Sequence, residues 1–167
     1  MLTALMVATA LIVTGCTRSE QVGNWVATDP PEAVSRTMPI EAELADGTYW
    51  GSIRESSGEV GFVLAVARFG DECERWAQEV GLEMGCPNDY AVEEVGQRVV
   101  TLLPDARITV AAPSAPGTSW QISSELLTAL AAGQVTDAPE GYDWVPFPFL
   151  LTIAGGEVVA ADQYWVP

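Results

Sequence analysis

The apolar residues of this chain occur in short runs separated by glycine, proline and acidic residues, a spacing typical of strands joined by tight turns. Residues 48–55 are rich in strand formers, and residues 56–58 (Ser-Ser-Gly) favour a turn. Residues 60–69 are apolar at nearly every position. Both faces of this second strand are therefore expected to be covered, as in the centre of a sheet.

Two more strands are expected in the middle of the chain. Residues 98–103 and 107–111 have the composition of short strands, and residues 104–106 (Pro-Asp-Ala) separate them. Because proline presets the backbone for a turn, this separator predicts a tight turn between the two strands. Residues 120–122 are expected to begin another short strand.

The last part of the chain carries a hairpin signal. Apolar runs at residues 147–154 and 157–164 flank Gly155 and Gly156. Both glycines can adopt positive φ without steric cost, so the pair predicts a tight β-hairpin turn. The chain then contains about six strands.

A helical pattern follows the second strand. Asp71 is placed to accept hydrogen bonds from the first helical turn, and Glu74 lies three residues later, as in a capping box. Gly81 suits the position just after the helix. The residues between these signals form one apolar face, with the spacing i, i+3, i+4 and i+7: Cys73, Trp76, Ala77 and Val80.

Ser123 is a suitable N-cap for a second helix, which Gly133 ends. The residues that share its apolar face are Leu126, Leu127, Leu130 and Ala131. Because most connections are tight, we expect an α+β fold, with an antiparallel sheet of about six strands and two helices packed on it.

The N-terminal residues predict where the protein is located. Residues 2–13 are almost wholly apolar, too short to span a bilayer, for which a helix needs about 20 residues, but of the length of a signal-peptide core. Residues 13–16 read Val-Thr-Gly-Cys and resemble the bacterial lipobox, although no Lys or Arg precedes them. The resemblance implies that residues 1–15 are a cleaved signal peptide and that the Cys16 thiol carries a lipid. A chance match, or an ordinary signal peptide cut nearby, is the alternative.

The lipobox reading places the mature chain on the extracytoplasmic face of the cell membrane, held by its acyl chains. Residues 16–46 include two adjacent prolines and show little periodicity, so we expect a flexible tether. Trp25 and Val26 can dock on the domain, which would order part of this tether. Residues 47–167 are then expected to form one globular domain.

Two cysteines remain when Cys16 is assigned to the lipid. Cys73 and Cys86 form an even pair in an oxidising compartment, where a disulfide is expected. Closing a loop of this size restricts the unfolded chain and stabilises the fold by roughly 3 kcal/mol. A metal site, the alternative, needs more thiol or imidazole ligands than this chain contains.

Charge and composition exclude several functions. The chain has 23 acidic residues, seven Lys and Arg residues and no histidine, with a net charge of −16, so nucleic acid would be repelled. Without histidine or lysine, nucleophiles activated by either base are not available. No phosphate-binding motif and no cofactor motif is present. Carboxylates remain as candidate catalysts.

The acidic residues form three local clusters, which are Asp71 with Glu72, Asp89 with Glu93 and Glu94, and Asp137 with Glu140 and Asp143. Catalysis by carboxylates needs two of them across a cleft, about 5–9 Å apart. Calcium also binds carboxylates, but residues 137–143 do not match a calcium-loop motif. Solvated acids on a charged surface are the expectation, with no catalytic residue and no bound metal.

Aromatic residues are the remaining candidates for binding. Two of the six tryptophans, Trp50 and Trp76, fit core positions of a strand and a helix. The aromatics near the ends of the last hairpin are candidates for an exposed surface that binds a sugar or a peptide: Tyr142, Trp144, Tyr164 and Trp165. Ordinary core and edge packing is the alternative.

Several segments resemble small uncharacterised lipoproteins of actinobacteria. They are the Gly-Thr-Tyr-Trp-Gly run from Gly47, the Cys-Pro-Asn-Asp-Tyr block at residues 86–90, and the Gln-Tyr-Trp-Val-Pro ending at residues 163–167. The resemblance implies the anchor and the disulfide, and it implies no activity. We therefore expect a non-catalytic binding or interaction module of the cell envelope, without a cofactor, whose partner is an envelope protein or a glycan. The alternatives are a carboxylate-dependent hydrolase and a structural or accessory envelope protein.

Overall fold

The structure is a computed structural model, and it describes residues 21–22, 24–30, 37, 39–40, 43–56, 59–112, 117–135 and 137–165. The expected signal peptide at residues 1–15 and the lipidation site at Cys16 lie outside these residues. Within the described part of the chain, no helix is long and apolar enough to cross a membrane.

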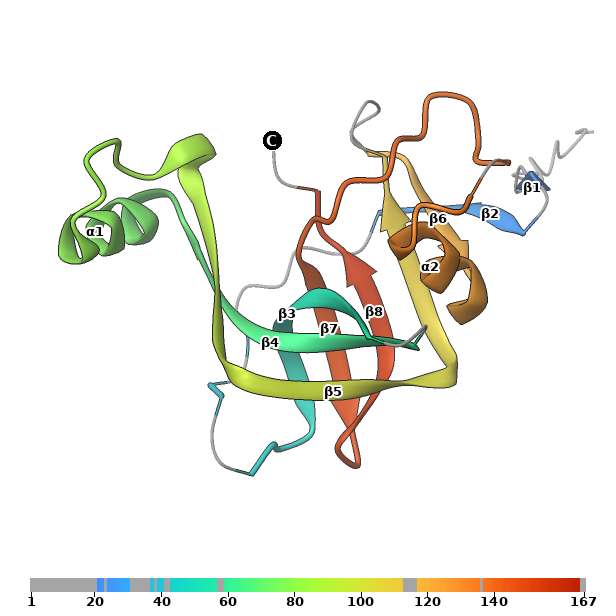
Figure 1. The fold of residues 1–167 in the computed structure, drawn as a ribbon, viewed down its shortest axis with the longest axis horizontal. Coiled ribbons are helices and arrows are strands. Elements are labelled where there is room, and N and C mark those ends of the chain that lie inside the picture. Colours follow the sequence, from blue (N-terminus) through green and yellow to red (C-terminus); the bar gives the residue numbers. More distant parts are fainter. Residues whose placement is uncertain are drawn as a thin grey trace, which may run out of the picture.

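The described residues form one mixed sheet of eight strands with two α-helices, so the expected α+β class is confirmed while the strand number is higher than six. One short 3₁₀ helix, η1, adds to these elements (Figure 1). In chain order the elements are β1 (Gln21–Val22), β2 (Trp25–Thr28), β3 (Gly47–Ser56), β4 (Glu59–Phe69), α1 (Gly70–Val80), η1 (Pro87–Asp89), β5 (Tyr90–Ala111), β6 (Ser119–Ile122), α2 (Ser124–Ala131), β7 (Phe149–Ala154) and β8 (Glu157–Gln163).

Five strands close on themselves. The sheet runs in the order β1-β2-β6-β5-β4-β3-β7-β8, and β8 also pairs with β5. Strands β5, β4, β3, β7 and β8 therefore form a closed ring, which we call the barrel, and β6, β2 and β1 extend from β5 (Figure 1). The β5–β8 pairing is parallel, so the expectation of a wholly antiparallel sheet is wrong at the point of closure.

Strand β5 replaces the two short strands expected at residues 98–103 and 107–111, and the turn expected between them is wrong. Its first half pairs with β4, and its last residues pair with both β6 and β8. The ladder with β8 shifts register between Leu102 and Arg107, a segment that includes Pro104. Proline cannot donate to a ladder, so it interrupts the pairing here, but the chain continues as a strand.

The hydrophobic core lies inside the barrel. Tyr49, Leu64 and Leu151 are almost completely buried in one large cluster, while their neighbours Trp50, Ala65 and Leu150 are buried in a separate, smaller cluster. This alternation follows from the two-residue period of a strand, which sends successive side chains to opposite faces. Residues 62–65 of β4 are all buried, so the predicted coverage of both faces is confirmed there, whereas residues 66–68 are only partly buried and Phe69 is exposed.

Helix α2 begins and is capped as expected. The Ser123 hydroxyl accepts a hydrogen bond from the backbone N–H of Leu126, at 3.2 Å. Leu127 and Leu130 are buried against the barrel core, and Gly133 follows the helix with a φ of 67°. This N-cap satisfies one of the backbone donors that a helix start leaves unpaired.

The predicted hairpin is also confirmed. Ala154 of β7 pairs with Glu157 of β8, which leaves Gly155 and Gly156 as the turn. Their φ angles are 61° and 84°, a conformation that glycine adopts at little cost. The Asp46 carboxylate accepts the Gly155 N–H at 2.8 Å and so connects the turn to the start of β3.

Part of the expected tether at residues 16–46 belongs to the sheet, so the assignment of that whole range to a flexible segment is wrong. Strand β2 pairs with β6, and Trp25 is completely buried. Its ring contacts Trp120 and Tyr142. The docking that was allowed for Trp25 and Val26 is confirmed, because an indole buries a large apolar area.

A second unit, which we call the arm, projects from the barrel (Figure 1). It consists of residues 65–69 of β4, helix α1, residues 81–86, η1 and residues 90–94 of β5. Strand β3 stops pairing with β4 at Ala65, so beyond this point β4 and β5 continue as a two-stranded ribbon. Helix α1 sits at the end of the ribbon, next to η1.

Candidate functional site

The predicted aromatic surface is not one exposed platform. Tyr142 is buried, with ring centroids 4.6 Å from Trp25 and 5.5 Å from Trp120. It is therefore a core residue, which corrects its assignment to a binding surface. Burial raises the pKa of its phenol well above the usual range, and among the described residues its hydroxyl has no hydrogen-bond partner. Trp144 is half-buried against the same core.

The other two residues of that prediction, Tyr164 and Trp165, follow β8. The Tyr164 ring lies 5.5 Å from Trp50 and 6.3 Å from Phe69, centroid to centroid, on the outer face of the barrel. Tyr164 and Trp165 also line a pocket of about 200 Å³ next to Gln163. The four predicted residues are thus divided between the interior and the outer face.

The arm is held by a disulfide between Cys73 and Cys86, as predicted, with a Cα–Cα distance of 5.7 Å. Cys73 and Ala77 are the completely buried residues of α1. The Glu74 carboxylate accepts the backbone N–H of Cys86 at 3.2 Å, so it connects α1 to the returning loop and does not close a capping box. Helix α1 begins at Gly70 without a side-chain cap, which corrects the role expected for Asp71.

Two arginines on β3 and β4 bind the acidic pair on β5. Arg68 donates to Glu93 at 2.9 Å, and Arg54 donates to Glu94 at 2.7 Å. The Arg68 guanidinium also lies 5.1 Å from the centroid of the Trp76 ring, an attractive cation–π geometry. These contacts position Trp76, because Arg68 connects α1 to the ribbon below it.

A groove of about 470 Å³ lies between the arm and the barrel. Its residues come from β3, α1, η1, β5, residue 82 and the segment before β7. The lining residues are Ser52, Trp76, Leu82, Pro87, Tyr90, Ala91, Val92, Pro146 and Pro148. Trp76 was expected in the core, but it is only partly buried and lines this groove.

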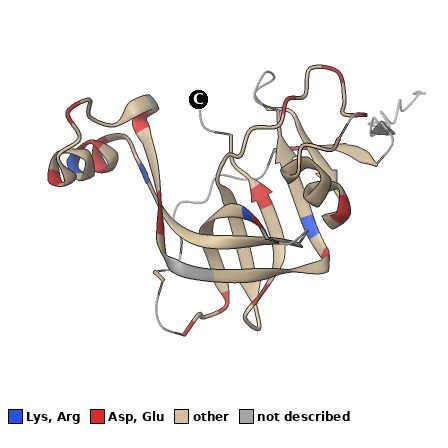
Figure 2. Cartoon of the chain, viewed as in Figure 1, with Lys and Arg blue, Asp and Glu red and all other residues tan. Residues whose placement is uncertain are grey.

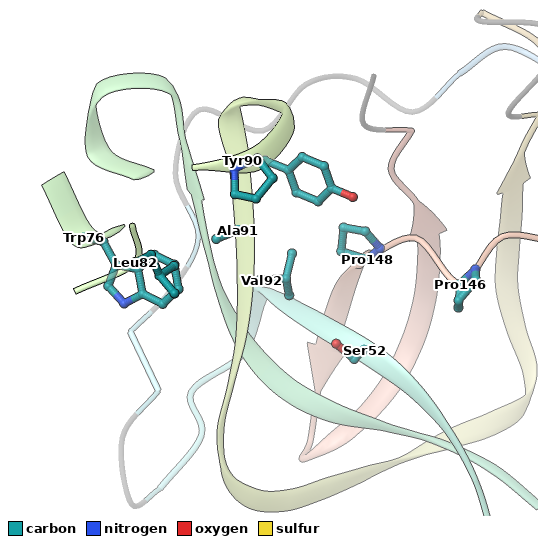
Figure 3. Close-up of a pocket in the computed structure, with 9 residues that line it drawn as sticks. Ser52, Trp76, Leu82, Tyr90, Ala91, Val92, Pro146 and Pro148 are labelled. Atoms are coloured by element: carbon teal, nitrogen blue, oxygen red, sulfur yellow. The ribbon is translucent and has the colours of Figure 1, made fainter. Parts of the chain in front are cut away.

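Figure 3 shows how the groove is built. Trp76 and Leu82 lie on the side of the arm, and Pro146 and Pro148 lie on the side of the barrel. Tyr90 points its hydroxyl toward the Pro148 side. Rigid aromatic and proline rings thus face each other across a space, an arrangement that binds apolar groups at a low cost in side-chain entropy.

None of the nine lining residues is charged, in a chain with 23 acidic residues. Acidic side chains lie elsewhere on the arm, including α1, as Figure 2 shows. Leu82, which lines the groove, is 45% exposed, and two residues close to it in the chain are also exposed, Val80 by 53% and Met84 by 88%. Such a cluster of exposed apolar side chains indicates an interaction surface.

The acidic clusters form no active-site arrangement in the described residues. Glu93 and Glu94 are occupied by arginines. Asp71 and Glu74 line one shallow hollow together with Arg75 and Gln78. Among the residues described, no three His, Cys, Asp or Glu side chains are placed to hold a metal ion, including the acids of residues 137–143.

Reasoning from the sequence missed the groove. Its barrel side depends on Pro146 and Pro148, whose Pro-Phe-Pro pattern after Trp144 marks a rigid segment without indicating what faces it. Tyr90, the first residue of β5, was not singled out in the sequence as a binding residue. No family model, curated protein or solved structure matches this chain.

Proposed function

We propose that this protein is a lipid-anchored, extracytoplasmic lipoprotein that acts as a non-catalytic binding module of the cell envelope, with the groove as its ligand site. One observation carries the proposal: the described residues that line the groove are all uncharged, and most of them are aromatic residues and prolines, on a strongly acidic chain. A solvent-exposed apolar groove is costly in water unless a ligand covers it.

The anchor part of the proposal rests on the lipobox at residues 13–16 and on the resemblance to small actinobacterial lipoproteins. Attachment through Cys16 would keep the domain at the membrane, while its negative charge opposes contact with anionic lipid headgroups. Replacing Cys16 with alanine should abolish acylation and, because the same motif directs the cut, leave residues 1–15 attached. Mass spectrometry of the native protein should find no Met1 peptide and an acylated Cys16.

Photo-cross-linking in intact cells tests the binding part. A photoreactive amino acid at position 82, on the arm side of the groove, should capture a specific adduct. The matched control places the same group at Glu157, which is exposed at the turn between β7 and β8. Adducts at both positions alike, or at neither, would overturn the groove as the binding site.

A further inference from the structure

We infer that the groove, together with the C-terminal end of α1, binds a segment of a partner protein that carries apolar side chains followed by arginine or lysine. This inference rests on the proposed function, because it assumes that the groove is the binding site. The inference adds which chemical groups the bound segment carries. Three features of the arm support it: an apolar strip, the charge at its side and the way in which both are held in place.

The apolar strip is the set of three exposed aliphatic residues at the end of α1 and in the following loop, of which Leu82 also lines the groove. Leu82 lines the groove and is itself 45% exposed, and its neighbours in the chain, Val80 and Met84, are 53% and 88% exposed. These are flexible or branched aliphatic side chains, which suit a protein partner, since sugars are usually recognised by flat aromatic faces. The partner segment is therefore expected to supply apolar side chains.

The charge beside this strip is negative from two sources. Glu79 in the last turn of α1 and Glu83 in the following loop are both exposed, and the last turn carries no basic residue. The carbonyl end of a helix adds partial negative charge at the same place. Acidic residues at a helix C-terminus oppose the macrodipole, so a cation from a partner would relieve an unfavourable arrangement in the free protein.

The strip and the acidic residues are held in a fixed position. Gly81, with a φ of 76°, ends α1 in the left-handed conformation, and the N–H of Leu82 bonds to the Ala77 carbonyl at 2.8 Å. The disulfide fixes the other end of the loop at Cys86. Because the loop is ordered before binding, a partner would lose less entropy on docking.

Peptide binding tests this inference on the full mature chain in detergent. The probes are a fluorescent peptide of alternating Leu and Trp followed by several Arg, and a matched peptide in which Glu replaces each Arg. The Arg peptide should bind at least about tenfold more tightly, which corresponds to about 1.4 kcal/mol. Fluorescence anisotropy at two salt concentrations measures both affinities.

An acidic protein attracts any cationic peptide, so the decisive variant adds negative charge. The double variant Leu82→Asp and Met84→Asp should bind the Arg peptide roughly tenfold more weakly if the apolar strip is the docking surface, a loss of about 1.4 kcal/mol. If the peptide binds only through general electrostatic attraction to an acidic protein, the double variant should bind it as tightly as the wild type or more tightly. Val99→Asp, at a residue 53% exposed on β5, is the matched control and should bind like the wild type.

The charge at the end of α1 is tested separately with Glu79→Gln and Glu83→Gln, which should weaken binding and reduce its salt dependence. Equal binding of both peptides, or unchanged binding by the double Asp variant, would overturn the inference. If position 82 cross-links a partner in cells while neither peptide binds, the groove remains the site and the proposed chemistry is wrong. Absence of both signals removes the proposed function itself.

Discussion

The barrel and the arm are stabilised in different ways, although β4 and β5 run through both. In the barrel, buried side chains such as Phe62, Phe149 and Leu151 fill a common interior. In the arm, Cys73, Ala77 and Cys86 are the buried members of a much smaller cluster. A two-stranded ribbon is marginally stable by itself, so the arm depends on its disulfide and on the contacts of Arg68.

If the groove is the ligand site as proposed, stability and recognition are located in different regions. The barrel buries large side chains such as Phe62 and Phe149, although Val99 of β5 is exposed, whereas the arm leaves Val80, Leu82 and Met84 exposed. A cross-linked arm keeps its shape without burying these side chains, so they remain accessible to a partner. The following predictions test this separation, beginning with the largest effect.

Removing a core side chain of the barrel should lower the stability of the whole protein. Phe62 is completely buried and its ring centroid lies 5.1 Å from that of Phe149, so Phe62→Ala should lower the free energy of unfolding by about 3–5 kcal/mol. Urea denaturation followed by tryptophan fluorescence measures it. Val99→Ala, at an exposed position, should change the value by less than about 0.5 kcal/mol. Similar losses in both variants would contradict the location of the core.

Removing the disulfide should affect the arm and spare the barrel. In a variant with Cys73→Ala and Cys86→Ala, the loop loses a cross-link expected to contribute roughly 3 kcal/mol. Hydrogen exchange should accelerate in residues 70–89, while the amides of β7 and β8 keep their protection. If all strands lose protection together, the arm and the barrel unfold as one cooperative unit, which would contradict their separate stabilisation.

The two helices offer a smaller contrast at their first turns. Ser123 caps α2 with a hydrogen bond, so Ser123→Ala should cost about 1 kcal/mol. Asp71 makes no capping bond in α1, so Asp71→Ala should lose only its favourable interaction with the helix dipole, about 0.5 kcal/mol. Thermal denaturation by circular dichroism compares the two. A larger loss for the Asp71 variant would restore the predicted capping box.

Tyr142→Phe should have the smallest effect at neutral pH. The buried hydroxyl has no hydrogen-bond partner, so its removal should leave stability unchanged or raise it by up to about 1 kcal/mol. Because burial raises the pKa of Tyr142 in the folded state, stability should fall above pH ~10, where the phenol ionises in the unfolded chain. Between pH 7 and pH 11, the free energy of unfolding of Tyr142→Phe should therefore fall less than that of the wild type, as measured by urea unfolding at both pH values. An equal fall in the two proteins would contradict the burial of the phenol.

Features determined by neighbouring residues could be predicted from the sequence. Gly155 and Gly156 indicate the hairpin because the turn needs two positive φ angles, and Ser123 indicates a helix start because its hydroxyl can reach the first turn. The disulfide could be predicted because two cysteines remain as a pair and an oxidising location was expected.

Features determined by distant residues could not be predicted. Pro104 indicated a turn, but β5 continues because β6 and β8 pair with the residues beyond it. Tyr142 looked like a surface residue of an acidic loop, and its contacts with Trp25 and Trp120, both distant in the chain, explain its burial. The groove could not be predicted for the same reason, since its two sides come from distant parts of the chain and meet only in the folded protein.

Strand β5 has a mechanical consequence. It begins at Tyr90 in the arm and ends at Ala111 between β6 and β8, without leaving the sheet. A partner that pulls on the arm along this strand therefore applies its force parallel to the strand axis. Because β4 and β5 both enter the arm, the ladders that hold them in place, β4 with β3 and β5 with β6 and β8, then resist by shear, in which many hydrogen bonds share the tension at once.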